Sequence, residues 1–253
     1  MRHEGLVEEF PSLYDLTYAD YQEDIPFWID LIGRTEVLEL GVGTGRVALP
    51  LAVAGAGVTG LDHSLQMIRS ARNKMTQAGS RINLVYSDLT RLPFSEGSFA
   101  SVICPFSTIN YVTDLAALRR AFSEARRVLR KGGLFAFEAL SWHTYDRWLN
   151  NDGLQHVVDR VGKAPGEPID ITYSYQFDAA HQIATQERLY RVTVADGVRK
   201  EYLIHWRNRF AFRAEYLLLL EDSRFAIELE AGDYQGSTYS HDAEAYIVVC
   251  RAV

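Results

Sequence analysis

The chain has 253 residues, of which 47% are hydrophobic and 23% charged, and its formal net charge is −7. This length suffices for one large α/β domain with an elaboration, and the net negative charge disfavours nucleic acid or an anionic membrane as a partner. Since the amino terminus lacks an apolar signal core and no stretch is long and apolar enough to span a bilayer, we expect a cytoplasmic protein.

The first 33 residues are predicted to form a helical cap over the rest of the protein. The segment from Tyr14 to Gly33 reads as helical and has a high density of aromatic side chains. Tyr14 and Tyr18 are four positions apart, so they would share one face of a helix. That face either packs on a sheet or closes a binding site from the amino-terminal side.

From residue 36 to residue 139, short apolar runs alternate with amphipathic helical segments, which is typical of βαβ units and a parallel sheet. Ser64 and Asp114 stand at the N-cap positions of two predicted helices, and Gly132-Gly133 would end the second of them. The predicted strands of this region are Glu36–Leu40, Val58–Asp62, Asn83–Ser87, Ser101–Cys104 and Leu134–Ala139.

The pattern changes after this region, because residues 170–205 alternate in period two. Ile171, Tyr173 and Tyr175 are separated by polar residues, as in a strand with one buried face. The dipeptide Asp196-Gly197 favours a tight hairpin turn between two further strands. We therefore expect a small antiparallel sheet here.

These patterns divide the chain into two parts. Residues 1–140 and 211–253 would form the α/β domain, and residues 141–210 would be inserted into it as a β-rich lid. The elements predicted to complete the α/β domain are a helix near Phe212–Leu220 and the strands Ala226–Glu230 and Ala245–Cys250.

The strongest local motif is a buried strand that runs into three alternate glycines, Gly41, Gly43 and Gly45. Glycines are needed where the backbone turns tightly and approaches a ligand without an intervening Cβ. A dinucleotide fingerprint would also require glycine at position 46, where this chain has Arg46. The spacing therefore weakens a pyrophosphate-binding interpretation.

Two carboxylates are predicted to reach the same edge of the sheet. Asp62 ends the next strand and could accept both hydroxyl groups of a ribose, in an NAD-dependent enzyme or an adenosyl-cofactor enzyme alike. Asp88 ends the strand after that and could hold an adenine amino group. For both acids the alternative is a simple helix cap at the end of a strand.

Taken together, the ordered motifs resemble the class I methyltransferase family that uses S-adenosylmethionine. The run from Glu39 to Gly45 is similar to the family's first motif, Asp62 to its ribose acid, Asp88 to its adenine contact, and Arg130-Lys131-Gly132-Gly133 to its later turn. The resemblance implies a doubly wound, Rossmann-like sheet of seven strands, the last antiparallel. The residues it implies for cofactor binding are Glu39, Gly41, Gly43, Gly45, Asp62 and Asp88. Further candidates for cofactor binding, chosen from their positions beside these motifs or at the expected mouth of the site, are Tyr14, Tyr18, His63, Met67, Leu89, Phe106 and Ser107.

The run from Phe106 to Tyr111 and the predicted lid are similar to small-molecule members, including sugar-nucleotide and glycine-type N-methyltransferases. This narrower resemblance implies direct in-line methyl transfer to a small amine or hydroxyl. An amine needs only a lone pair, whereas a hydroxyl needs a base. The candidate base is His143, after the fifth strand, and the candidates for acceptor contacts are Tyr111, Tyr173, Tyr175 and His205.

Two other functions remain open at this point. An NAD-linked oxidoreductase shares the glycine turn and Asp62 but leaves Arg46 and Asp88 unexplained, and a non-catalytic protein could bind an adenosyl ligand without transferring methyl. The histidines and cysteines show no metal-ligand spacing, so no metal is predicted. The expected partner is a small methyl acceptor, and the sequence leaves a homodimer open.

Overall fold

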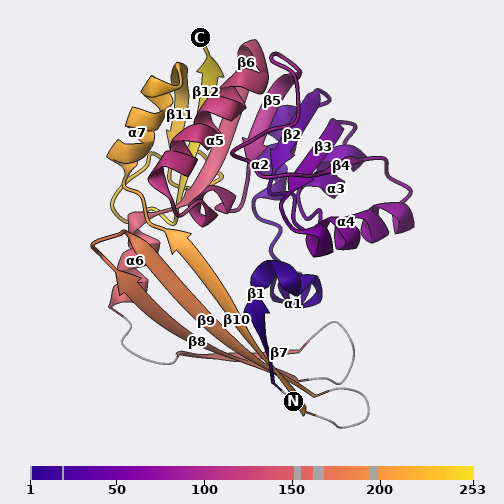
Figure 1. Cartoon of the computed structure of the whole chain (residues 1–253), viewed down its shortest axis with the longest axis vertical. Helices are drawn as coiled ribbons and strands as arrows, with labels where there is room; N and C mark the ends of the chain where they lie inside the picture. The colour runs from indigo at the N-terminus through magenta and orange to yellow at the C-terminus, as the bar shows by residue number, and fades with distance from the viewer. Residues whose placement is uncertain (1, 19, 151–154, 162–167, 194–198) are drawn as a thin grey trace.

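The computed structural model describes residues 2–18, 20–150, 155–161, 168–193 and 199–253, and within them the strands form two sheets (Figure 1). The larger sheet has the mostly parallel arrangement that the sequence predicted, and its one reversed strand lies near the end of the chain. In spatial order its strands are β11 (Phe225–Ala231), β12 (Ala245–Ala252), β6 (Leu129–Leu140), β5 (Phe99–Cys104), β2 (Glu36–Leu40), β3 (Gly57–Asp62) and β4 (Asn83–Tyr86).

Helices cover both faces of this sheet, so the doubly wound fold is confirmed. On one face the buried side chains of α5 (Leu115–Val128) and α7 (Arg213–Asp222) pack on the strands. On the other face the same is true of α2 (Ile25–Ile32), α3 (Ala48–Val53) and α4 (Leu65–Gln77). Each face thus has its own apolar cluster, as expected where a sheet is buried on both sides.

Local sequence explains where the helices that flank the site begin. Ser64 is the N-cap of α4 and accepts a hydrogen bond from the backbone of Met67. Asp114 is the N-cap of α5 and accepts one from the backbone of Ala117. Both caps were predicted, because serine and aspartate satisfy the free N–H groups of a first helical turn.

The strand order places a crevice at the middle of the larger sheet. The chain passes from β2 to β3 and β4 on one side, and then returns to β5 on the other side of β2. In such sheets ligands bind beyond the carboxyl ends of the strands at this switch point. The carboxyl end of β2 is where the glycine turn begins.

The smaller sheet lies below the larger one in Figure 1, with α1 (Pro11–Tyr18) between them. It has buried side chains on the face toward α1, including Ile171, Tyr190 and Trp206. The predicted turn at Asp196-Gly197 lies outside the described residues. The strands of this sheet, in spatial order, are β1 (Arg2–Leu6), β10 (Arg199–Arg209), β9 (Ile183–Thr193), β8 (Pro168–Asp178) and β7 (Gln155–Val161).

The amino-terminal segment differs from the predicted helical cap. Instead of one helical stretch from Tyr14 to Gly33 it contains β1, the short 3-10 helix η1 (Val7–Glu9), α1 and then α2. β1 pairs in parallel with β10 and so belongs to the smaller sheet. This strand could not be predicted from the sequence because residues 2–6 are mostly polar, as edge strands can be.

Two further elements differ from the sequence prediction. The segment after β6 begins with helix α6 (Trp142–Leu149), capped by Ser141, where no helix was predicted from the sequence. Strand β6 begins at Leu129 rather than at Leu134, because Leu129 already pairs with Phe99 of β5; the register shifts between this pair and the next, so the pairing is irregular there. Gly132, with φ +72°, lies in that irregular part. Among the described residues no helix combines the length and the apolar character needed to cross a membrane.

Candidate functional site

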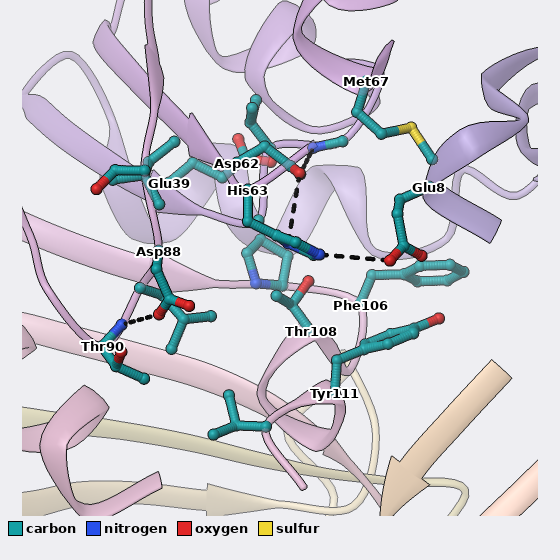
Figure 2. Close-up of a pocket in the computed structure, with 18 of the residues that line it drawn as sticks. Glu8, Glu39, Asp62, His63, Met67, Asp88, Thr90, Phe106, Thr108 and Tyr111 are labelled. Carbon is teal, nitrogen blue, oxygen red and sulfur yellow. Dashed lines mark hydrogen bonds and ion pairs between the residues drawn. The ribbon is translucent and has the colours of Figure 1, made fainter. Parts of the chain in front are cut away.

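A cavity of about 410 Å³ opens at the carboxyl ends of the central strands (Figure 2). Eleven residues that the sequence analysis proposed for the site line it, and they come from η2 (Thr108–Tyr111) as well as from α1, α4 and the strand ends. They are Tyr14, Glu39, Gly41, Gly43, Asp62, His63, Met67, Asp88, Leu89, Phe106 and Tyr111.

The glycine turn forms one wall of the cavity. The backbone nitrogens of Gly41 and Val42 donate to the carbonyl of Leu61, at 2.8 and 2.9 Å, so the turn is tied to the end of β3. Gly41 has φ +71°, and a Cβ there would collide with the side chain of Thr108. At Gly43, with φ +54°, a Cβ would meet nothing closer than 4.0 Å, so the space in front of it belongs to the cavity.

Gly45 does not line the cavity. It has φ +85°, and a Cβ there would approach Met75 on α4 to 3.0 Å. The physical reason for glycine at this position is therefore close packing of the turn on a neighbouring helix.

Asp62 lines the cavity and is held by two backbone hydrogen bonds. Its two carboxylate oxygens accept hydrogen bonds from the backbone nitrogens of Gly43 and Ser64, both at 2.8 Å. Burial raises the pKa of Asp62, and these two bonds oppose that rise. The side chain is thereby fixed at the junction of the glycine turn and α4.

The next residue carries an ion pair to the amino-terminal segment. His63 Nε2 lies 3.5 Å from an oxygen of Glu8, which belongs to η1. The hydrogen bond to Glu8 raises the pKa of His63, and the same bond lowers the pKa of Glu8 against the opposing effect of its burial. The ion pair joins η1 to the end of β3.

One end of the cavity is formed by Asp88 and its neighbours. Asp88 is exposed and accepts a hydrogen bond of 2.7 Å from the backbone of Thr90. Leu89, the residue after Asp88, also lines the cavity, as does Met67 on α4, which is 4% exposed. The cavity therefore combines apolar side chains with the exposed carboxylate of Asp88, which suits a flat, polar-edged ring.

A buried acid and a buried base lie beside the glycine turn at the other end. Glu39 is 2% exposed, and its Oε2 has no hydrogen-bond partner among the described residues. Arg46 pairs with both oxygens of Asp24 at 2.7 Å, yet its Nε has no partner in that same part of the chain. Burial raises the pKa of Glu39 well above its ordinary value, and the nearby Arg46 only partly offsets this.

The end of β5 adopts an unusual backbone conformation. Phe106 and Ser107 have φ +52° and +55°, which is uncommon for residues other than glycine. Glu138 on β6 accepts hydrogen bonds from the Phe106 backbone at 2.9 Å, the Ser107 hydroxyl at 3.1 Å and the Tyr234 hydroxyl at 2.6 Å. The Phe106 ring lies 4.3 Å from the guanidinium of Arg46, so the turn is held from both sides.

Seven of the proposed site residues do not line the cavity. The Tyr18 ring packs on Phe106 from behind, at 4.9 Å, and Ser107 turns toward Glu138. His205 lies between Glu4 and Glu187, at 3.2 and 3.4 Å. The full set is Tyr18, Gly45, Ser107, His143, Tyr173, Tyr175 and His205.

His143 lies on α6, and Tyr173 and Tyr175 lie on β8. A catalytic role for His143 therefore finds no geometric support at the cavity.

Several lining residues were not foreseen. Arg46 entered the sequence analysis only as a mismatch to a dinucleotide motif, and no motif marks the short segment that carries Glu8. The loop after β5 and the start of α5 also contribute polar side chains. The main additions are Glu8, Arg46, Thr90, Thr108, Thr113 and Arg120. Among the residues whose structure is described, no group of three or more His, Cys, Asp or Glu could hold a metal ion.

The glycine turn and the strands around it match known proteins. Residues 37–133 match the family model described as a methyltransferase domain. The chain is 41% identical over 103 residues to the malonyl-(acyl-carrier protein) O-methyltransferase of Geobacter sulfurreducens, covering 40% of this chain and 37% of that protein. Over the first three curated relatives, the matches span 37%, 56% and 46% of the relatives' length.

Solved structures match the whole fold. An S-adenosylmethionine-dependent methyltransferase from Clostridium acetobutylicum superposes with a TM-score of 0.80 at 19% identity, over 97% of this chain and 98% of that one. An amino pentose methyltransferase from Micromonospora echinaspora, solved with S-adenosylmethionine bound, gives 0.74 at 18% identity, over 95% and 97%. At such identities the likeness concerns the fold, and it includes the smaller sheet.

Proposed function

We propose that this protein is a class I S-adenosylmethionine-dependent methyltransferase, which transfers the methyl group of that cofactor to an amine or hydroxyl group of a small molecule. The match of residues 37–133 to the methyltransferase-domain model supports this proposal. The observation that carries the proposal concerns two side chains beside the glycine turn, Glu39 and Arg46. Each has a buried polar atom without a hydrogen-bond partner among the described residues. The atoms are Glu39 Oε2 and Arg46 Nε, and leaving such buried polar atoms unpaired is costly. An amino-acid group would complete both.

The residues present fit the cofactor in three places. Glu39 Oε2 and Arg46 Nε have no partner in the part of the chain that the structure describes. The first suits an ammonium group and the second a carboxylate, which are the two charges of a methionine moiety. Asp62, fixed by its two backbone hydrogen bonds, suits the hydroxyls of a ribose. Met67 and Leu89 supply apolar cover for an adenine, and Asp88 an acceptor for its amino group.

The chain needs few catalytic side chains for this chemistry. When bound, S-adenosylmethionine supplies a methyl group already activated by a positively charged sulfur. The protein's part is to align the acceptor and to exclude water. Phe106, Tyr14 and Tyr111 line the cavity between the glycine turn and the smaller sheet, and they would enclose an acceptor there. An amine acceptor would need no base, which agrees with the position of His143 outside the cavity.

The test begins with binding. Calorimetry with S-adenosylhomocysteine should give saturable one-to-one binding, whereas NAD should give no heat beyond dilution. The reaction is then tested with S-adenosylmethionine and a panel of small amines, hydroxyl compounds and activated carbon acids, scored by release of S-adenosylhomocysteine. Turnover of an amine or hydroxyl is expected. Tight binding without transfer to any acceptor would favour a non-catalytic binding protein, and absent binding would overturn the proposal.

A further inference from the structure

The smaller sheet carries a buried arginine on the face toward α1. Arg188 lies on β9, is 8% exposed and stands directly opposite Tyr173 on β8. Its guanidinium carbon lies 4.1 Å from the ring centre of Trp206, 4.9 Å from that of Tyr173 and 5.6 Å from that of Tyr18. The charge is therefore enclosed by three aromatic rings.

This arginine has no acidic partner within the part of the chain that the structure describes. Its Nε donates to Gln186 Oε1 at 2.7 Å, but its Nη1 has no hydrogen-bond acceptor among those residues. Other well-buried arginines of the chain differ in this respect, because Arg46 pairs with Asp24 and Arg209 with Glu215. Contacts with aromatic rings offset only part of the cost of a buried charge.

Arg188 is also close to the cavity. The Tyr18 ring that faces it packs on the rings of Tyr14 and Phe106, at 5.0 and 4.9 Å, and both of those residues line the cavity. One layer of aromatic side chains thus separates the guanidinium from the cavity. Around it the same face of the sheet carries the polar side chain of Gln186, which is 4% exposed.

We propose that the methyl acceptor carries an anionic group, a carboxylate or a phosphate, that binds to Arg188. This inference rests on the proposed function, since it names the class of acceptor for that site. A guanidinium presents a planar fork of donors that matches both anions. Because Nη1 is enclosed, the anion reaches it when the side chain of Tyr18, the last residue of α1, turns aside.

The experiment measures anion binding directly with small fluorinated probes. Trifluoroacetate represents the carboxylate, monofluorophosphate the phosphate, and 2,2,2-trifluoroethanol is the uncharged control. Each is titrated against the full-length protein, with and without S-adenosylhomocysteine, and followed by ¹⁹F line width at constant ionic strength. At least one anion should bind saturably to the wild type, more tightly than trifluoroethanol, and which of the two does so identifies the acceptor's anionic group.

Variants assign that binding to Arg188. Arg188→Met should weaken it at least tenfold, while Arg188→Lys, which keeps the charge but not the fork, should weaken it less. Arg191→Met is the matched control, because Arg191 lies on the opposite face of β9 and pairs with Glu201; it should bind the anion as the wild type does.

Two outcomes would overturn the inference. In the first, the wild type binds neither anion more tightly than trifluoroethanol. In the second, Arg188→Met and Arg188→Lys bind the anions as the wild type does. Affinity for S-adenosylhomocysteine is a separate readout and should stay within twofold in all three variants. If the wild type does not bind S-adenosylhomocysteine at all, that result counts against the proposed function and not against the anion site.

Discussion

The carboxylate of Glu138 on β6 holds the backbone of Phe106 at the end of the neighbouring strand, through a hydrogen bond of 2.9 Å from the Phe106 nitrogen. Phe106 and Ser107 are two successive non-glycine residues with positive φ. Such conformations persist only where surrounding contacts impose them, and they cluster at functional sites. Glu138 supplies those contacts from below, so the shape of the cavity wall depends on a side chain that does not line it.

Replacing Glu138 tests this dependence. Glu138→Ala removes the acceptor for a backbone N–H and two hydroxyls, so we expect a loss of about 2–4 kcal/mol in the free energy of unfolding. Glu138→Gln keeps one acceptor oxygen and should lose less. Chemical denaturation measures both, and calorimetry with S-adenosylhomocysteine should show weaker binding to the alanine variant. If Glu138→Ala is as stable as the wild type and binds as tightly, the turn at Phe106 and Ser107 does not depend on Glu138.

Asp62→Ala should weaken binding of S-adenosylhomocysteine at least tenfold, which is about 1.4 kcal/mol. The change removes the proposed ribose acceptor and also the two hydrogen bonds that tie the glycine turn to α4. Asp88→Ala is the comparison, because Asp88 is exposed and, among the described residues, accepts a hydrogen bond from the Thr90 backbone alone. The loss of affinity in Asp88→Ala should be smaller. Equal effects of the two substitutions in calorimetry would contradict the central place given to Asp62.

Glu39→Gln should have opposite effects on stability and on binding. Burial raises the folded-state pKa of Glu39, so ligand-free wild-type protein loses stability as pH rises from the ordinary glutamate range toward that raised value. The glutamine variant lacks this loss. It should match the wild type near pH 4 and be more stable above it, by urea denaturation at several pH values.

The same variant should bind S-adenosylmethionine at least tenfold more weakly, about 1.4 kcal/mol, because the ammonium would lose its charged partner. In the wild type, pairing with an ammonium would favour the ionised carboxylate, so binding should release a proton near neutral pH. Calorimetry in buffers of different ionisation enthalpy detects that proton. If the variant binds S-adenosylmethionine as tightly as the wild type does, the proposed contact between Glu39 and the ammonium group is wrong.

The pair of His63 and Glu8 predicts a pH-dependent link between the amino-terminal segment and β3. A raised histidine pKa stabilises the folded state below about pH 6.5, and the contribution disappears as pH rises through the raised value. Glu8→Gln should therefore lower Tm near pH 6 and change it little near pH 9. Since the His63 side chain is 62% exposed, solvent screening keeps the loss below about 1 kcal/mol.

Glu9→Gln is the control for that series, because Glu9 is the exposed neighbour of Glu8 in η1. It should leave Tm unchanged at both values of pH. A Glu8→Gln variant whose Tm falls equally at pH 6 and pH 9 would show that the ion pair does not contribute through the charge of His63.

The larger sheet could be predicted because its signals are local. Apolar runs define the strands, and the caps at Ser64 and Asp114 fix the helix starts on either side of the site. Gly41, Gly43 and Asp62 then meet because the carboxyl ends of parallel strands share one edge. The residues that belong to this framework were recognised from their order and spacing alone.

The rest depends on contacts between distant segments. Nothing near Glu8 in the sequence indicates that it meets His63, and Glu138 lies in a strand pattern that predicts only burial. No motif in the sequence marks Arg188, and only the strand register shows that it stands opposite Tyr173. Such side chains acquire their chemistry from tertiary packing, which a single sequence does not display.

β1 pairs in parallel with β10, with Arg2 beside Glu201, and so covers the edge of β10. Without residues 2–6 the long strand β10 would present a bare row of N–H and C=O groups to solvent, and such rows recruit strands from other molecules. Trimming these residues to ease crystallisation or to attach a tag should therefore produce oligomers joined through that edge, visible as early-eluting species in size-exclusion chromatography.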